Sequence, residues 1–88
     1  MKLSFPNPSR SYDAVRHGIS FWGYDAAIEV PFFLEESALV RLDPKARDGE
    51  AAILATFDAA RDRIHEVADR IHGFHKRSFH VLVADDFR

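Results

Sequence analysis

A stripe of apolar side chains in the second half of the chain limits the fold more than any other feature. Seven residues recur along it at spacings of three and four: Ile53, Phe57, Ala60, Ile64, Val67, Ala68 and Ile71. At ~100° per residue, all seven fall within about 60° of one direction on a helical wheel. We therefore predict a long helix over residues 50–72 with one buried face, which Gly73 ends.

The first half of the chain predicts a β-hairpin over residues 18–33. Two runs rich in Ile, Val and aromatic residues, 18–24 and 27–33, are separated by Asp25 and Ala26. The second run has apolar residues at every other position, which is typical of a half-buried strand. Because Pro31 cannot donate a backbone hydrogen bond, we expect this strand to lie at an edge of the sheet or to carry a bulge. If it is an edge, the first strand lies in the centre.

Three further segments complete the predicted order. Residues 34–42 predict a short helix, with Glu35 and Glu36 in the first turn, where the helix dipole favours acids. Residues 78–84 predict a final strand, and residues 1–17 an irregular N-terminal arm. The sequence thus predicts an α+β fold in the order β-β-α-α-β. In it, one short and one long helix pack on one face of a small three-stranded, mainly antiparallel sheet. The direction of the final strand stays open.

Length and composition narrow the class of protein. A chain of 88 residues can build only one core, so we expect a single domain over residues 1–88. The net charge of −2 gives no large positive field, which makes binding to nucleic acid or to a membrane unexpected. The chain has no Cys, and residues 1–13 lack the apolar core of a signal peptide. We therefore expect a cytoplasmic protein.

One flank of the predicted long helix carries a row of polar side chains that could bind a metal. His65, Asp69 and His72 follow one another at spacings of four and three, so they share a side of the helix. Two imidazoles and a carboxylate suit zinc or iron. The alternative is an exposed row of charged side chains without a ligand, since no HExxH-like motif is present. A metal-binding protein is thus one of the alternative functions.

Arg61 is the member of this flank that lies closest to the apolar stripe. A guanidinium at the edge of a core must be paired with a carboxylate, for which Asp58, Asp13 and Asp25 are candidates. We predict a structural ion pair of Arg61 with Asp58 or Asp13 rather than a clamp for a substrate.

The face of the sheet that the helices leave open predicts an interaction surface. If Ile19 and Phe21 point to the helices, Trp22 and Tyr24 point away from them, because neighbouring side chains in a strand alternate. We take Trp22, Tyr24 and His80 as the candidate interaction surface. Either the N-terminal arm covers the aromatic side chains or a protein partner does, and a second copy of the chain is one such partner.

Motifs that would indicate an enzyme are missing from the sequence. No GxSxG motif and no glycine-rich phosphate loop is present. We therefore predict a non-enzymatic interaction or regulatory module that needs no cofactor. A nucleic-acid-binding regulatory protein is the other alternative, because residues 75–77 are basic and Trp22 or Tyr24 could stack on a base.

Several short segments, in order, resemble one family of bacterial proteins. They are F-P-x-x-S-R-x-Y-D (Phe5, Pro6, Ser9, Arg10, Tyr12, Asp13), I-x-F (Ile19, Phe21), E-E-x-A-L (Glu35, Glu36, Ala38, Leu39), F-x-x-x-R-x-x-I-x-x-x-A (Phe57, Arg61, Ile64, Ala68) and a closing A-D-D-F. Together they resemble the domain of unknown function 1488. The resemblance implies a small α+β domain from a bacterium. It implies no activity and no catalytic residues, and it marks Arg61 as a position where the family pattern has arginine.

Overall fold

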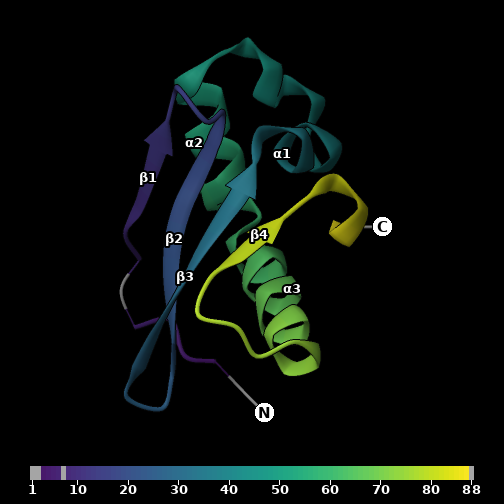
Figure 1. Cartoon of the computed structure of the whole chain (residues 1–88). Coiled ribbons are helices and arrows are strands. Elements are labelled where there is room, and N and C mark those ends of the chain that lie inside the picture. The colour runs from purple at the N-terminus through teal and green to yellow at the C-terminus, as the bar shows by residue number, and fades with distance from the viewer. Residues whose placement is uncertain (1–2, 7, 88) are drawn as a thin grey trace.

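The computed structural model describes residues 3–6 and 8–87 and has a four-stranded sheet. Strands β1 (Arg10–Asp13), β2 (Gly18–Asp25) and β3 (Ile28–Glu35) follow one another as antiparallel neighbours. The fourth strand, β4 (His80–Leu82), pairs in parallel with β3. The predicted α+β class and hairpin are confirmed, and Figure 1 shows the strands in the order β1-β2-β3-β4.

Two details of the predicted sheet are wrong. The N-terminal arm contributes β1, where Tyr12 pairs with Ile19, so the sheet is not three-stranded. The strand that carries Pro31 is not at the edge, because β4 lies beside it. The proline is tolerated there because β4 pairs only with residues 32–34 of β3, so at Pro31 the ladder has a partner on the β2 side alone.

The long helix of the prediction is two helices. Helix α2 (Glu50–Ala59) and helix α3 (Arg61–Phe74) meet at Ala60, whose φ of −104° and ψ of 14° leave the helical region. Figure 1 shows the change of direction between them. The apolar stripe is buried on both helices, with Ile53 and Phe57 on α2 and Ile64 on α3. Gly73 does not end the helix, which continues to Phe74.

Shorter helical segments connect these elements. Residues 34 and 35, assigned to the short helix by the sequence, belong to β3, and helix α1 spans Glu36–Leu42. A 3₁₀ helix, η1 (Pro44–Asp48), leads to α2, and a second one, η2 (Ala84–Phe87), follows β4. Among residues 3–6 and 8–87, no helix is long and apolar enough to cross a membrane.

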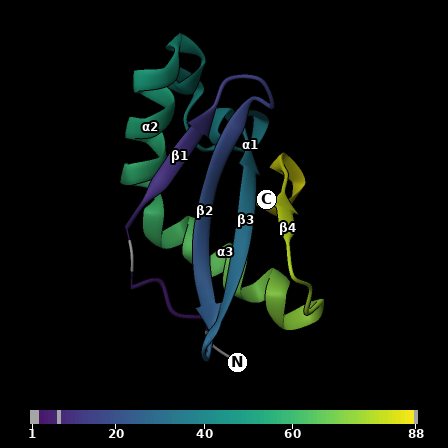
Figure 2. The same ribbon diagram turned by 60° about the vertical axis from the view of Figure 1, so that its left-hand side comes forward.

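The core lies between the sheet and the helices. Figures 1 and 2 show α1, α2 and α3 on the same side of the sheet, as predicted. The sheet contributes buried Ile19, Phe21, Val30, Phe32 and Leu34. Ile19 pairs with Leu34 and Phe21 pairs with Phe32 across the hairpin, so the helices cover the same face of β2 and of β3.

The beginning of the chain also packs on this inner face. Ser4 and Tyr24 exchange two backbone hydrogen bonds of 2.9 and 2.8 Å. The ring of Phe5 lies 6.3 Å from that of Phe21 and stacks at 3.8 Å on the imidazole of His65. Gly23 makes room for it, since a Cβ there would come within 2.6 Å of the Phe5 ring. Gly23 therefore lies inside β2, and this part of the arm does not cover the outer face.

Candidate functional site

The outer face of the sheet carries an apolar surface, which we call the outer patch. Alternation along each strand and the pairing register place its members on the side away from the helices: Trp22, Pro31, Phe33, Phe79 and Val81. Trp22 pairs with Pro31, and Phe33 pairs with Val81, so the side chains are neighbours across three strands. Phe79 and Val81 are exposed by 42% and 44%.

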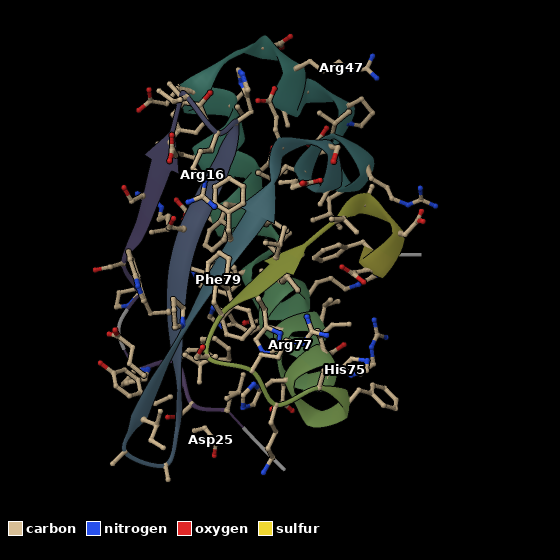
Figure 3. All side chains as sticks on the ribbon, in the orientation of Figure 1. Arg16, Asp25, Arg47, His75, Arg77 and Phe79 are labelled. Atoms are coloured by element: carbon tan, nitrogen blue, oxygen red, sulfur yellow. The ribbon has the colours of Figure 1, made fainter. Side chains whose placement is uncertain are left out.

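Charged side chains frame the outer patch at both ends. The Arg16 guanidinium lies 4.3 Å from the centre of the Phe33 ring and covers it, which explains why this outward-facing ring is buried. At the hairpin end, the Tyr24 hydroxyl donates to Glu29 at 3.3 Å. Figure 3, which looks onto this face, shows Arg16 and Phe79 in front of the sheet. Trp22 and Tyr24 lie on the outer face, as the strand alternation predicted, and both are partly buried.

His80 is not part of this surface, which corrects the third member of the candidate set. It faces the helices and is only 4% exposed, because β4 turns His80 and Leu82 inward and leaves Phe79 and Val81 outside. Its imidazole stacks on Phe32, with ring centres 5.1 Å apart. The polar side chain is tolerated there because it has a partner on α3.

That partner is His72, and the two imidazoles continue to a carboxylate. His72 Nδ1 lies 2.8 Å from His80 Nε2, and His72 Nε2 lies 3.0 Å from Asp25 Oδ2. The resulting hydrogen-bonded series, Asp25–His72–His80, joins the end of the hairpin, the last turn of α3 and β4. We call it the buried histidine chain. Sequence patterns do not predict it, since its three members come from distant segments.

The carboxylate sets the direction of the hydrogen bonds in this chain. Asp25 can only accept, so His72 Nε2 carries a hydrogen and donates it. In the tautomer in which His72 Nδ1 carries no hydrogen, Nδ1 accepts, and His80 donates from Nε2. Burial lowers the pKa of His80, and the nearby His72, Arg77 and His75 lower it further, so His80 is held neutral. Its Nδ1 is left with a free lone pair.

The structure does not bring the three members of the predicted metal row on α3 together. His65 stacks on Phe5, and Asp69 accepts a hydrogen bond of 2.6 Å from the backbone N–H of Leu3. His72 is turned to Asp25 and His80. In the part of the chain that the structure describes, no three His, Cys, Asp or Glu residues are placed to hold a metal ion. Each member of the row packs against a different segment.

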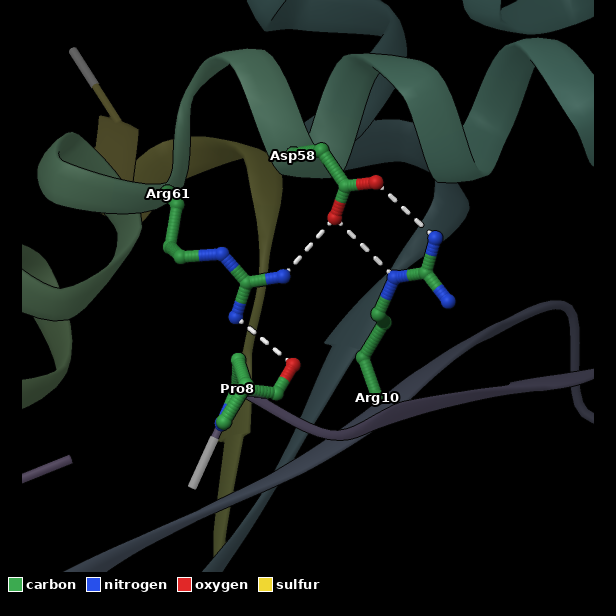
Figure 4. Close-up of polar contacts among 4 residues, drawn as sticks. All are labelled: Pro8, Arg10, Asp58 and Arg61. Carbon is green, nitrogen blue, oxygen red and sulfur yellow. Dashed lines mark hydrogen bonds and ion pairs between the residues drawn. The ribbon is translucent and has the colours of Figure 1, made fainter. Parts of the chain in front are cut away.

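The predicted ion pair of Arg61 is present, with Asp58 and not with Asp13. Figure 4 shows Asp58 between the guanidinium groups of Arg61 and Arg10. Arg61 donates to the Asp58 carboxylate at 2.8 Å, and Arg10 donates to it at 2.9 and 3.0 Å. Arg61 also donates to the carbonyl of Pro8 at 2.9 Å. The hydrogen bond from Arg10 lowers the pKa of Asp58, and the bond from Arg61 adds to this. This group, which we call the Asp58 cluster, ties the arm and β1 to the junction of α2 and α3.

Asp13 has a different structural role. The Asp13 carboxylate accepts from the backbone N–H groups of Val15 and Arg16 at 3.0 Å, which shapes the turn between β1 and β2.

Figure 3 shows Arg16 and Arg77 far apart along the sheet. Arg16 and the basic segment at residues 75–77, which the nucleic-acid alternative combines, therefore do not lie side by side.

Comparison with known proteins gives one match. A family model described as "Protein of unknown function (DUF1488)" matches residues 3–76, which is more than half of the chain and confirms the resemblance found in the sequence. The match ends before β4 begins. No curated protein and no solved structure matches the chain.

Proposed function

We propose that this chain, which belongs to the family described as protein of unknown function (DUF1488), is a non-enzymatic protein-interaction module that binds a second copy of itself through the outer patch. One observation carries the proposal. The inner face of the sheet is fully used by the core, whereas the outer face presents neighbouring apolar side chains with no helix of the described chain over them. Apolar surfaces of this kind mark interaction sites on small proteins.

The charges at the two ends of the outer patch favour a second copy as the partner. Arg16 lies over Phe33, and Glu29 lies on the same face four residues earlier in β3, about 13 Å away at the usual rise of a strand. A two-fold axis near Trp22 and Pro31 places Arg16 of each copy opposite Glu29 of the other. A two-fold interface needs such self-complementarity.

The size of the patch sets the expected strength. The outer patch has five side chains, whereas a standard interface uses about 20–30 residues and buries about 800 Å² per partner. We therefore expect a weak dimer whose population rises with concentration. A cytoplasmic, bacterial setting, as the sequence predicts, is compatible with such regulation by concentration.

Two exposed valines give a matched test. Val81 lies on the outer patch at 44% exposure, and Val15 lies off it, in the turn after β1, at 87% exposure. Sedimentation equilibrium of the wild type should show concentration-dependent dimers. Val81→Lys should weaken dimerisation at least tenfold, because it places a charge in the interface, and Val15→Lys should leave it unchanged.

A charge swap tests the orientation of the two copies. Arg16→Glu and Glu29→Arg should each weaken the dimer, and the double variant should recover it, since the pair is then re-formed with opposite signs. A wild-type chain that sediments as a strict monomer at the highest attainable concentration would refute the proposal. Equal behaviour of the two lysine variants would refute the assigned surface.

A further inference from the structure

A cleft lies between α3 and β4, beside the buried histidine chain. It has a volume of about 410 Å³, within the ordinary range for small-molecule sites. Its lining residues are Ile71, His75, Arg77, Phe79, His80, Val81 and Asp86. Figure 3 shows Arg77 and His75 on this side of the molecule, at the connection from α3 to β4.

His80 brings an unused acceptor to the cleft. The residue is 4% exposed, and its Nδ1 has no hydrogen-bond partner among residues 3–6 and 8–87. Yet no fully buried side-chain nitrogen or oxygen in this part of the chain lacks a partner. Nδ1 must therefore reach the accessible surface, and the surface that His80 lines is this cleft. The direction of the hydrogen bonds from Asp25 leaves a lone pair there.

Arg77 brings an unused charge to the same cleft. Within the described part of the chain its guanidinium makes no hydrogen bond or ion pair. Asp86 is also in the wall, with one carboxylate oxygen accepting from the N–H of Val83 at 2.8 Å. A dianionic phosphate would be repelled by Asp86, whereas a single carboxylate can bind the fork of Arg77 in two places. Ile71 and Phe79 supply apolar walls.

A larger hollow of about 670 Å³ lies between the β1–β2 turn and α1. Part of its charge is already engaged, since His17 lies 3.9 Å from Glu36 and Arg16 lies over Phe33. Its wall has no buried polar side chain with a free atom. The cleft at His80 is therefore the stronger site.

We propose that the cleft binds a small carboxylate that carries a hydroxyl or N–H group next to the carboxylate and a branched apolar group. The carboxylate binds Arg77, the hydroxyl or N–H donates to His80 Nδ1, and the apolar group packs on Ile71 and Phe79. A free hydroxy acid and the last residue of a peptide share this chemistry. The cleft shares Phe79 and Val81 with the outer patch, so binding is measured at concentrations where the chain is a monomer.

The test uses a set of matched probes and ¹⁵N-edited NMR titration of the full chain. The first probe is 2-hydroxy-4-methylpentanoate; 4-methylpentanoate lacks the donor, and the amide of the first probe lacks the charge. N-acetyl-leucine represents a peptide end. We expect shifts confined to the cleft, with the first probe or N-acetyl-leucine bound more tightly than either of the other two. Which of the two binds identifies the source of the ligand.

Two variants assign the roles. Arg77→Gln should weaken binding about tenfold or more, because a charge-assisted hydrogen bond is lost. Arg41→Gln, which changes an exposed arginine on α1, should not. His80→Phe should remove the preference for the hydroxy acid over 4-methylpentanoate. A purely structural role of His80 would leave that ratio unchanged.

A measurement on the wild type keeps the proposal testable if His80→Phe does not fold. Long-range ¹H–¹⁵N spectra should show His80 protonated at Nε2 and not at Nδ1, and the Nδ1 signal should move with the hydroxy acid or N-acetyl-leucine but not with 4-methylpentanoate. A hydrogen on Nδ1 in the free protein would overturn the proposal. So would equal binding by Arg77→Gln and Arg41→Gln, or no cleft shifts at millimolar probe.

Discussion

The Asp58 cluster and the buried histidine chain both connect distant segments through polar side chains, but they do so in opposite ways. Asp58 has 45% side-chain exposure and neutralises two arginines, so the cluster satisfies itself in contact with water. The histidine chain is buried, has the carboxylate of Asp25 at one end and ends in a free lone pair at the other. The difference indicates that the first connection is structural, while the second can also receive a ligand.

The largest effect is expected from removing the middle of the histidine chain. His72→Ala leaves Asp25 and His80 without their shared partner in a buried place, which should lower the free energy of unfolding by about 2–4 kcal/mol. Urea denaturation measures this. His75→Ala, an exposed histidine three residues later, should change it by less than about 0.5 kcal/mol. Similar losses in the two variants would contradict the assigned role of the chain.

The second-largest effect is expected from a fall in pH, which should remove the stabilising contribution of His80 at a higher pH than that of the Asp58 carboxyl. The pKa of His80 is lowered, so the unfolded chain takes up its proton at a higher pH than the folded one does. The stabilising contribution of His80 is complete above its ordinary pKa of 6.5 and is lost as the pH falls through the folded value. Thermal melts between pH 7.5 and about pH 5 should show this loss.

The pKa of His65 is also lowered, by burial and by Arg61, so it contributes to the same range. Comparison with His80→Phe isolates the His80 part. If the variant shows the full slope of the wild type, His65 alone accounts for the acid sensitivity. The Asp58 carboxyl, whose pKa is lowered from 3.8, loses its contribution only below that value, as the pH falls through the folded pKa.

The smallest effect is expected from opening the Asp58 cluster. Asp58→Ala removes partners of both Arg10 and Arg61 in a solvated place, which should cost about 0.5–1 kcal/mol in the free energy of unfolding. Because salt screens exposed charges, this difference should shrink in about 1 M NaCl. The effect of His72→Ala should not. An Asp58→Ala effect that is insensitive to salt would show that the cluster acts by packing.

The sequence predicted those parts of the fold whose signal is local. The apolar stripe from Ile53 to Ile71, the hairpin and the opposite orientations of Phe21 and Trp22 follow from periodicity within one segment. The break at Ala60 does not, since alanine favours helices and the stripe continues across it. Only the packing of both helices against one small sheet requires the chain to turn there.

The candidate site shows the same limit. Phe79, Val81 and Val83 look like the buried side of the last strand, yet His80 and Leu82 are inside. In a strand of only three residues, a single contact can determine which side chains face the core. For β4 that contact is the one between His80 and His72, which becomes known only when α3 is placed beside β4. The ion pair of Arg61 with Asp58 was predictable because the two residues are three apart on one surface.

The parallel pairing of β3 with β4 has a consequence for how the molecule opens. Because β4 joins the sheet only after α1, α2 and α3 have intervened, its ladder closes a long loop with three residues at an edge. The amides of residues 80–82 should therefore exchange with deuterium through a partial opening of lower free energy than the amides of β2 and β3. In that open form His72 loses its hydrogen bond to His80, and the cleft loses the wall that β4 provides. A ligand bound to Arg77 and His80 would then stabilise the closed form, and its binding should slow the hydrogen exchange of the β4 amides.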